Sequence, residues 1–125
     1  MADQTNCGSK LILVVDDEPA MIYLVRRILA GKHNVIEASD GTQAVVMANS
    51  QKPALILMDM MMPKKDGLTA CAEIRANPET QTIPIIMLTG VGHELNIKPA
   101  GVWGVNKYIT KPFKPQDLLD AIDSV

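Results

Sequence analysis

The sequence predicts an α/β domain in which a five-stranded parallel sheet is doubly wound, with helices on both faces. Two observations lead to this prediction. Five short apolar runs alternate with longer segments that have helical periodicity. The runs do not alternate with polar residues, which is typical of strands covered by helices on both faces of a parallel sheet. Right-handed crossovers through the intervening helices would connect the strands.

The predicted strands are too short to be helices and are bounded by polar residues, Pro or Gly. Their apolar character on both sides indicates that they are buried in the domain. The runs are Leu11–Val15, Val35–Ile36, Leu55–Met58, Ile85–Leu88 and Tyr108–Ile109.

The first predicted helix follows the first strand. Pro19 suits a first helical position, because no N–H is needed there and its φ is already helical. Gly31 lies just past the last apolar position and is typical of a helix end. Between them, apolar residues recur at steps of three and four, which predicts an amphipathic helix. These residues are Met21, Leu24, Val25, Ile28 and Leu29.

Three further helices are predicted downstream. Asp40 can cap the second, the third spans Leu68–Arg75, and Pro115 stands at the first turn of the last. A short or distorted helix is expected within Gly92–Gly104, where Pro99 removes a backbone donor. The periodic positions are Ala44, Val45 and Ala48 in the second helix, Leu68, Cys71, Ala72 and Arg75 in the third, and Leu118, Leu119 and Ile122 in the last.

Length and composition indicate one domain, since 125 residues with 47% hydrophobic content can bury a single core. We expect a disordered tail at residues 1–9 and the domain at residues 10–125.

The net charge of −2 gives no basic surface for direct binding to nucleic acid or a membrane. No signal-peptide core or membrane-spanning run is present. Cys7 and Cys71 form no metal-binding or disulfide pattern, so a reducing cytoplasm is the simplest setting.

Asp59 places one carboxylate inside the apolar stretch LILMDMMMP. A lone ionised carboxylate is costly to bury, so it needs a partner, a metal or access to water. Ligands of doubly wound sheets bind beyond the carboxyl ends of the strands, where Asp59 is expected to lie. Other polar residues follow strands as well: Asp16, Asp17 and Glu18 after the first, Thr89 at the fourth and Lys111 at the fifth.

The three aspartates predict a site for a divalent cation. Asp16, Asp17 and Asp59 would repel one another at close range, which raises their pKa values unless a cation compensates. A set of oxygen ligands favours Mg²⁺, with Mn²⁺ as a substitute, and Mg²⁺ commonly binds phosphate oxygens as well. Asp59 could then attack a phosphoryl donor, while Lys111 and the Thr89 hydroxyl hold the transferred oxygens.

Four motifs, in the order VVDDEP, LILMDMMMPKKDG, PIIMLTG and YITKPF, resemble those of the receiver domain of two-component response regulators. The resemblance extends from Lys10 to the C-terminus and implies a flavodoxin-like (βα)5 fold. It implies a phosphoacceptor signalling domain that promotes its own phosphorylation and dephosphorylation, and not an enzyme that turns over an external substrate. A sensor histidine kinase or a histidine phosphotransfer protein would supply the phosphoryl group.

The resemblance also implies roles for individual residues. Asp59 would be the phosphoacceptor and Lys111 the lysine that contacts the phosphoryl group. Asp16 and Asp17 would position Mg²⁺ together with Asp59, and the backbone carbonyl of Met61 would be a further ligand.

A conformational switch is implied by the same resemblance. Thr89 would supply the switch hydroxyl, and Tyr108 would change rotamer when Thr89 moves. The face formed by residues 92–104, the last strand and the last helix would bind an unknown downstream target, or a second copy on activation. The Lys111–Pro112 peptide bond is expected to be cis, and Gly67 to open the third helix.

The sequence departs from the usual family pattern at two places. Lys64 and Lys65 stand where many members have Gly and Met, which changes the charge beside the acidic site. The segment Gly92–Gly104 lacks the expected charged amphipathic helix, and Trp103 falls where a small residue is common. Because this segment flanks Tyr108, partner choice and the coupling of the switch stay open.

Ordinary structural explanations compete with functional ones at several positions. Met58 and Met60–Met62 are typical of gap filling in a core rather than of metal binding. His93 is more typical of a solvated loop residue than of a phosphate ligand. Glu18 either orders metal-bound water or starts a helix, and Tyr108 is either a switch or a half-buried strand residue.

Three other functions compete with phosphoryl acceptance. A degenerate receiver would bind a partner without phosphorylation, but it usually lacks the acceptor, the acidic pair or the lysine. A hydrolase using an aspartyl phosphate needs a general acid two residues after Asp59, where Met61 stands. A flavin carrier would need a first loop that cradles phosphate, and DDEP repels it.

Overall fold

The structure, a computed structural model of the chain, describes residues 9–60, 67–90 and 105–125. Its five strands form one parallel sheet in the order β2-β1-β3-β4-β5. The strands are β1 (Leu11–Val15), β2 (Asn34–Ala38), β3 (Leu55–Asp59), β4 (Ile85–Thr89) and β5 (Lys107–Thr110). The helices of the described residues are α2 (Pro19–Leu29), α3 (Gly41–Gln51), α4 (Gly67–Ala76) and α6 (Pro115–Ser124).

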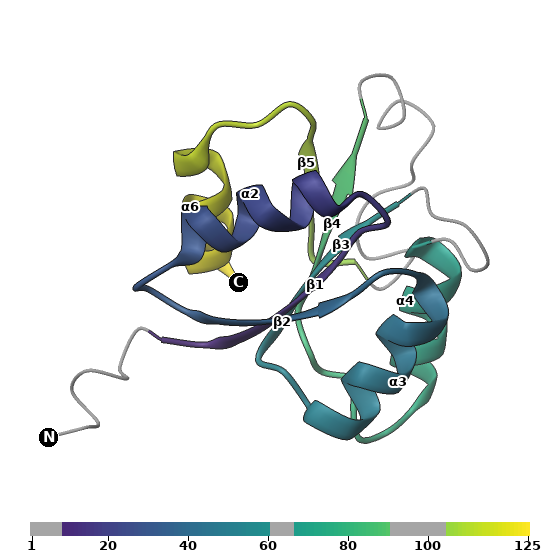
Figure 1. Cartoon of the computed structure of the whole chain (residues 1–125). Helices are drawn as coiled ribbons and strands as arrows, with labels where there is room; N and C mark the ends of the chain where they lie inside the picture. The colour runs from purple at the N-terminus through teal and green to yellow at the C-terminus, as the bar shows by residue number, and fades with distance from the viewer. Residues whose placement is uncertain (1–8, 61–66, 91–104) are drawn as a thin grey trace, which may run out of the picture.

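Helices cover the sheet on both faces, with α2 and α6 on one side and α3 and α4 on the other (Figure 1). Alternate residues of each central strand enter different hydrophobic clusters. Leu13 of β1 packs in the cluster that contains residues of α3 and α4, whereas Ile12 packs with residues of α2 and α6. The doubly wound, five-stranded α/β fold predicted from the sequence is therefore confirmed.

The strand positions are confirmed, but four strands are longer than predicted: β3 and β4 each extend by one residue, to Asp59 and Thr89, and the two edge strands extend at both ends. β2 extends beyond the Val35–Ile36 run because it is an edge strand, where the polar residues Asn34 and Glu37 remain exposed to water. β5, at the opposite edge, likewise begins at the exposed residue Lys107. Apolar runs alone mark only the buried part of an edge strand.

The predicted helix boundaries are also confirmed. Pro19 opens α2, and Gly31 follows its end with φ +78°. The side chain of Asp40 caps α3 by accepting a hydrogen bond from the backbone N–H of Gln43 at 2.8 Å. Gly67 opens α4 and Pro115 opens α6.

Two predicted apolar helix positions were wrong. Leu24 is 42% exposed, because the buried stripe of α2 is centred on Val25 and Leu29. In α4, Ala72 is exposed, and the buried residues are Ala70, Cys71 and Ile74. Both misplaced residues lie one position away from the stripe that faces the sheet, which corresponds to a turn of about 100° around the helix axis.

Some expectations lie outside the described residues: the tail at 1–8, the loop residues Met61, Lys64 and Lys65, and the segment 91–104 with His93 and Trp103. The Lys111–Pro112 peptide bond is cis, as expected. Within the described ranges no helix is both long and apolar enough to span a membrane.

Candidate functional site

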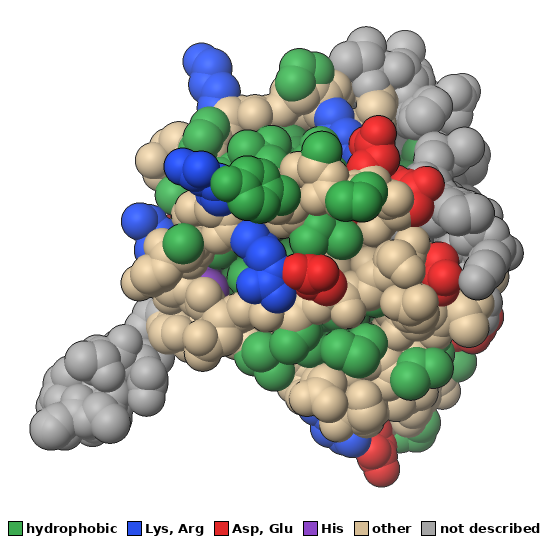
Figure 2. All heavy atoms as spheres, in the orientation of Figure 1, with side chains coloured by type: hydrophobic (Ala, Val, Ile, Leu, Met, Phe, Trp, Pro, Cys, Tyr) green, Lys and Arg blue, Asp and Glu red, His purple; other side chains and the backbone are tan. Residues whose placement is uncertain are grey.

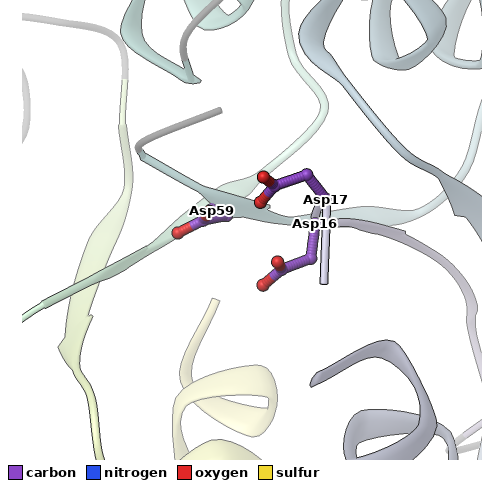
Figure 3. Close-up of side chains that lie close together, drawn as sticks. All are labelled: Asp16, Asp17 and Asp59. Atoms are coloured by element: carbon purple, nitrogen blue, oxygen red, sulfur yellow. The ribbon is translucent and has the colours of Figure 1, made fainter. Parts of the chain in front are cut away.

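Three carboxylates meet at the carboxyl ends of β1 and β3. The register pairs Val15 with Met58, so that Asp16, which directly follows β1, and Asp59, the last residue of β3, come side by side. Oxygen atoms of Asp16, Asp17 and Asp59 lie within 4.8 Å of one another, and Figure 3 shows the three side chains together at this edge of the sheet. Asp16 and Asp59 are 1% and 7% exposed, whereas Asp17 is exposed. The predicted acidic cluster therefore assembles.

Lys111 brings a cation to this cluster from the end of β5. Its Nζ lies 3.0 Å from Oδ1 of Asp59 and 3.3 Å from Oδ2 of Asp16. Burial by itself would lower the pKa of Lys111, but the hydrogen bond to Asp59 and the charges of both carboxylates raise it above its usual value. The ammonium group is therefore charged at neutral pH and bridges two of the three aspartates.

Burial and neighbouring groups act on the pKa of Asp16 in opposite directions. Its burial, and secondarily the charge of Asp59, raise the pKa of this carboxyl. The backbone N–H of Glu18, which donates to Oδ1 of Asp16 at 2.9 Å, and the ammonium of Lys111 oppose that rise without cancelling it. The cluster thus combines three carboxylates with the ammonium of Lys111, an arrangement in which an added cation would reduce the repulsion among the carboxylates.

Glu18 itself occupies the N-cap position of α2, where its side chain makes no capping hydrogen bond. Its backbone carbonyl accepts hydrogen bonds from Met21 and Ile22, as expected at a helix start. The helix-start explanation is thus supported, and a role in ordering metal-bound water stays a prediction.

Thr89 ends β4, the neighbour of β3 in the sheet. Asp59 is paired with Leu88, so Thr89 lies one residue beyond the register position of Asp59. Its hydroxyl is completely buried and donates to the carbonyl of Gly90 at 3.0 Å. Its own carbonyl accepts from the backbone N–H of Lys111 at 2.6 Å. Thr89 is thereby linked to the residue that holds Asp59.

Tyr108 lies on β5, opposite Met87 of β4. It is half-buried and packs against the cluster that includes Cys71 of α4. Burial, with a smaller effect of Cys71, raises the pKa of its phenol. This environment fits ordinary strand packing, and the rotamer change of Tyr108 stays a prediction.

A surface pocket of about 300 Å³, which was not predicted from the sequence, lies beside the acidic cluster. Tyr23 and Leu24 of α2 are exposed nearby, and Figure 2 shows apolar side chains gathered over this helix. Arg27 lies 5.7 Å from the centre of the Tyr23 ring. The apolar residues on the outer side of α2 were the available signal. The pocket is lined by Asp16, Asp17, Pro19, Ile22, Tyr23, Glu37 and Ser39.

A buried carboxylate, two further aspartates, a hydroxyl and a lysine at the ends of parallel strands are residue types that suit phosphoryl chemistry with a divalent cation. A family model described as "Response regulator receiver domain" matches residues 12–123. The chain belongs to this family, the receiver domain of two-component systems. It is 39% identical over 118 residues to the chemotaxis protein CheY of Halobacterium salinarum, which covers 94% of this chain and 97% of that protein.

A second relative is considerably longer than this chain. The alkaline phosphatase synthesis transcriptional regulatory protein PhoP of Bacillus subtilis is 39% identical over 111 residues, covering 88% of this chain but 45% of that protein. The chain thus spans about half the length of several curated relatives that it matches. These three relatives are transcriptional regulatory proteins.

Solved structures give the same family. A putative response regulator from Chloroflexus aurantiacus J-10-fl matches with a TM-score of 0.87, 31% identity and coverage of 93% of this chain and 96% of that one. The receiver domain of sensor histidine kinase PA1611 from Pseudomonas aeruginosa, with magnesium coordinated in its active site cleft, matches with a TM-score of 0.84 and 33% identity, covering 93% of this chain and 96% of that one. The Mn²⁺-bound response regulator Rcp1 matches with a TM-score of 0.75 and 34% identity, covering 92% of this chain and 90% of that one.

Proposed function

We propose that Asp59 accepts a phosphoryl group from a phosphorylated histidine of a sensor kinase or histidine phosphotransfer protein. The contact of Lys111 with both Asp59 and Asp16 is the observation that supports this most directly. The ammonium lies beside the proposed acceptor oxygens, where it can also meet negative charge on an incoming phosphoryl group. The family supplies the reaction class, and the geometry supplies the candidate residues.

In the proposed reaction an oxygen of Asp59 forms a bond to phosphorus while the bond from phosphorus to the donor's nitrogen or oxygen breaks. The bonding electron pair leaves with the donor group, so Asp59 becomes an acyl phosphate. Hydrolysis resets the protein, because water attacks phosphorus and the carboxylate of Asp59 leaves. The chain itself is the phosphoryl acceptor in this cycle and does not turn over an external substrate.

Mg²⁺ fits the residues of the acidic cluster. The donor set of Asp16, Asp17 and Asp59 is made of oxygens only, within 4.8 Å of one another, as a hard cation requires. The backbone carbonyl of Met61, outside the described residues, would complete the protein ligands. Bound Mg²⁺ would supply positive charge that offsets the negative oxygens of the phosphoryl group. Mn²⁺ is the expected substitute.

The output of phosphorylation is proposed to pass through Thr89 and Tyr108. A phosphoryl group on Asp59 adds negative charge and acceptor oxygens, for which the Thr89 hydroxyl could exchange its present bond to Gly90. Movement of Thr89 would shift a two-state equilibrium that includes Tyr108. This proposal requires the exposed fraction of the Tyr108 side chain, which is half-buried here, to change.

The surface around β5 and α6 is proposed to bind the downstream target, or a second copy on activation. A hollow of about 510 Å³ lies on this surface between β5 and α6, and Tyr108 is part of its lining. A change at Tyr108 would therefore alter the hollow directly. The buried thiol of Cys71 suits a reducing compartment, and the cytoplasm is part of the same proposal.

The test is incubation with acetyl phosphate, with and without Mg²⁺, followed by intact-mass measurement. We expect one added phosphoryl group on the wild type with Mg²⁺ and none on Asp59→Asn. Asp120→Asn removes an exposed carboxylate of α6 and serves as the matched control, which should be modified like the wild type. Equal modification of Asp59→Asn would contradict the assignment of the acceptor.

A further inference from the structure

Gly67, the first residue of α4, lies against the backbone of the proposed phosphoacceptor. Its N–H donates to the carbonyl of Met60 at 2.9 Å. A Cβ added at Gly67 would lie only 2.5 Å from the carbonyl oxygen of Asp59 and 3.0 Å from the Cα of Met60. It would also lie 3.0 Å from the Sδ of Met87. The start of α4 therefore packs on Asp59 at a distance that only glycine permits.

The need for glycine here is a matter of space rather than of backbone conformation. Gly67 lies in a helix and has no left-handed φ. Gly31 is the opposite case, because its φ is +78° and an added Cβ would meet no atom of the described residues within 4 Å. The close approach to Asp59 therefore accounts for glycine at this position.

Both sides of this contact are held in place. Asp59 belongs to β3, which pairs with β1 and β4, and the N–H of Met60 donates to the carbonyl of Leu88 at 3.0 Å. α4 is anchored in the core by Ala70, Cys71 and Ile74, each completely buried. Neither the strand end nor the helix can shift without disturbing packed neighbours.

We infer that Gly67 is a positioning residue for Asp59, an inference that rests on the proposed function of Asp59 as acceptor and magnesium ligand. A Cβ at Gly67 would have to move about 0.5 Å from the Asp59 carbonyl oxygen to reach even the shortest separation tolerated. Ligand distances in a metal site are acceptable only within about 0.2 Å. A shift of the Asp59 backbone by about 0.5 Å exceeds this tolerance and would disturb the ligand geometry of the acidic cluster.

The experiment compares Gly67→Ala with Gly31→Ala. The control also places a Cβ on a glycine and destabilises the fold through a strained φ, but it lies at the end of α2 rather than at Asp59. The first readout needs no metal: the ¹³C resonance of the Asp59 side-chain carboxyl, measured by NMR in EDTA. The second is the Mg²⁺ dissociation constant of the unphosphorylated protein, measured by calorimetry.

We expect the Asp59 carboxyl resonance to shift in Gly67→Ala but not in Gly31→Ala. We also expect Mg²⁺ binding to weaken by about tenfold or more in Gly67→Ala alone, as for loss of other groups that orient a metal ligand. An unshifted resonance, or a loss of affinity no larger than in the control, would mean that α4 yields instead of Asp59 and would overturn the inference.

Two further outcomes are distinguishable. A wild type that takes no phosphoryl group, combined with a shifted Asp59 resonance in Gly67→Ala, would reject the proposed function and leave the positioning role intact. If Gly67→Ala does not fold, the inference is tested on the wild-type protein instead. Saturating Mg²⁺ should then shift the backbone amide resonance of Gly67 and leave that of Gly31 unchanged, and an unmoved Gly67 amide would overturn the inference.

Discussion

Lys111 and Asp59 form an ion pair in which Nζ of the lysine lies 3.0 Å from Oδ1 of the carboxylate. The same ammonium group reaches Asp16 at 3.3 Å. One side chain from the end of β5 thus links the ends of β3 and β1, where two buried carboxylates would otherwise repel each other.

Replacement of Lys111 by Met is expected to destabilise the metal-free protein. It leaves Asp16 and Asp59 without their shared cation, and removal of one partner from a buried ion pair costs about 3–5 kcal/mol. Urea unfolding at pH 7 in EDTA measures the difference. Lys107→Met, at an exposed position of β5, should change the unfolding free energy by no more than about 0.5 kcal/mol. Equal losses in the two variants would show that the bridge contributes nothing.

Asp16→Asn is expected to stabilise the metal-free protein at neutral pH. Because the pKa of Asp16 is raised in the folded state, the folded protein binds this proton more tightly than the unfolded chain. That contribution to stability is complete below the ordinary value of 3.8 and is lost as the pH rises through the raised pKa. The advantage of the amide should therefore be present at pH 7 and shrink toward pH 4. Urea unfolding in EDTA would refute this if the variant were less stable at pH 7.

His33 predicts a second pH dependence, away from the acidic cluster. Its Nδ1 accepts the backbone N–H of Lys10 at 3.0 Å. Burial, then the charge of Lys10, lower the pKa of His33, with a smaller contribution from Lys32 and opposition from Asp123.

Because the pKa of His33 is lowered on folding, its contribution to stability is present above the ordinary value of 6.5 and is lost as the pH falls through the folded pKa. In His33→Asn the side-chain oxygen can still accept the Lys10 N–H, so the loss of stability between pH 7 and pH 5 should be smaller than in the wild type. Parallel pH profiles of the unfolding free energy in the two proteins would contradict this role.

Thr89→Ala is expected to separate phosphorylation from the switch. The Asp59 carboxylate and Lys111 remain, so the variant should still take up one phosphoryl group, while the hydroxyl proposed to move is gone. Beryllofluoride with Mg²⁺ should shift the ring resonances of Tyr108 in the wild type but leave them nearly unchanged in Thr89→Ala. Thr110→Ala, at the paired position of β5, is the control and should respond like the wild type. A full Tyr108 response in Thr89→Ala would remove Thr89 from the switch.

The fold was predictable because the strands are short apolar runs and the helix ends carry specific residues such as Pro19 and Asp40. The prediction was weaker where burial is partial. The residues at the ends of the edge strand β2 were not predicted to belong to it, because they include polar residues. Leu24 faces outward but was predicted to lie on the apolar face of α2. For β2, the sequence does not show that the strand lies at an edge of the sheet. For Leu24, it does not show which side of α2 faces the sheet.

Members of the candidate site were predictable because parallel strands end at a common edge, which brings Asp16 and Asp59 together. The bridge from Lys111 to Asp16 and the contact of Gly67 with Asp59 were not predictable. Both depend on distances of a few ångströms between residues far apart in the sequence. Composition and periodicity do not encode such distances.

The central claim is that Asp59 carries the phosphoryl group. Treatment of the Mg²⁺- and acetyl phosphate-modified protein with borohydride reduces an acyl phosphate to the alcohol, which converts the modified aspartate to homoserine. Tandem mass spectrometry then locates that residue. We predict homoserine at position 59 and at no other aspartate; homoserine at Asp16 or Asp17, or a phosphorylated protein with none, would contradict the claim.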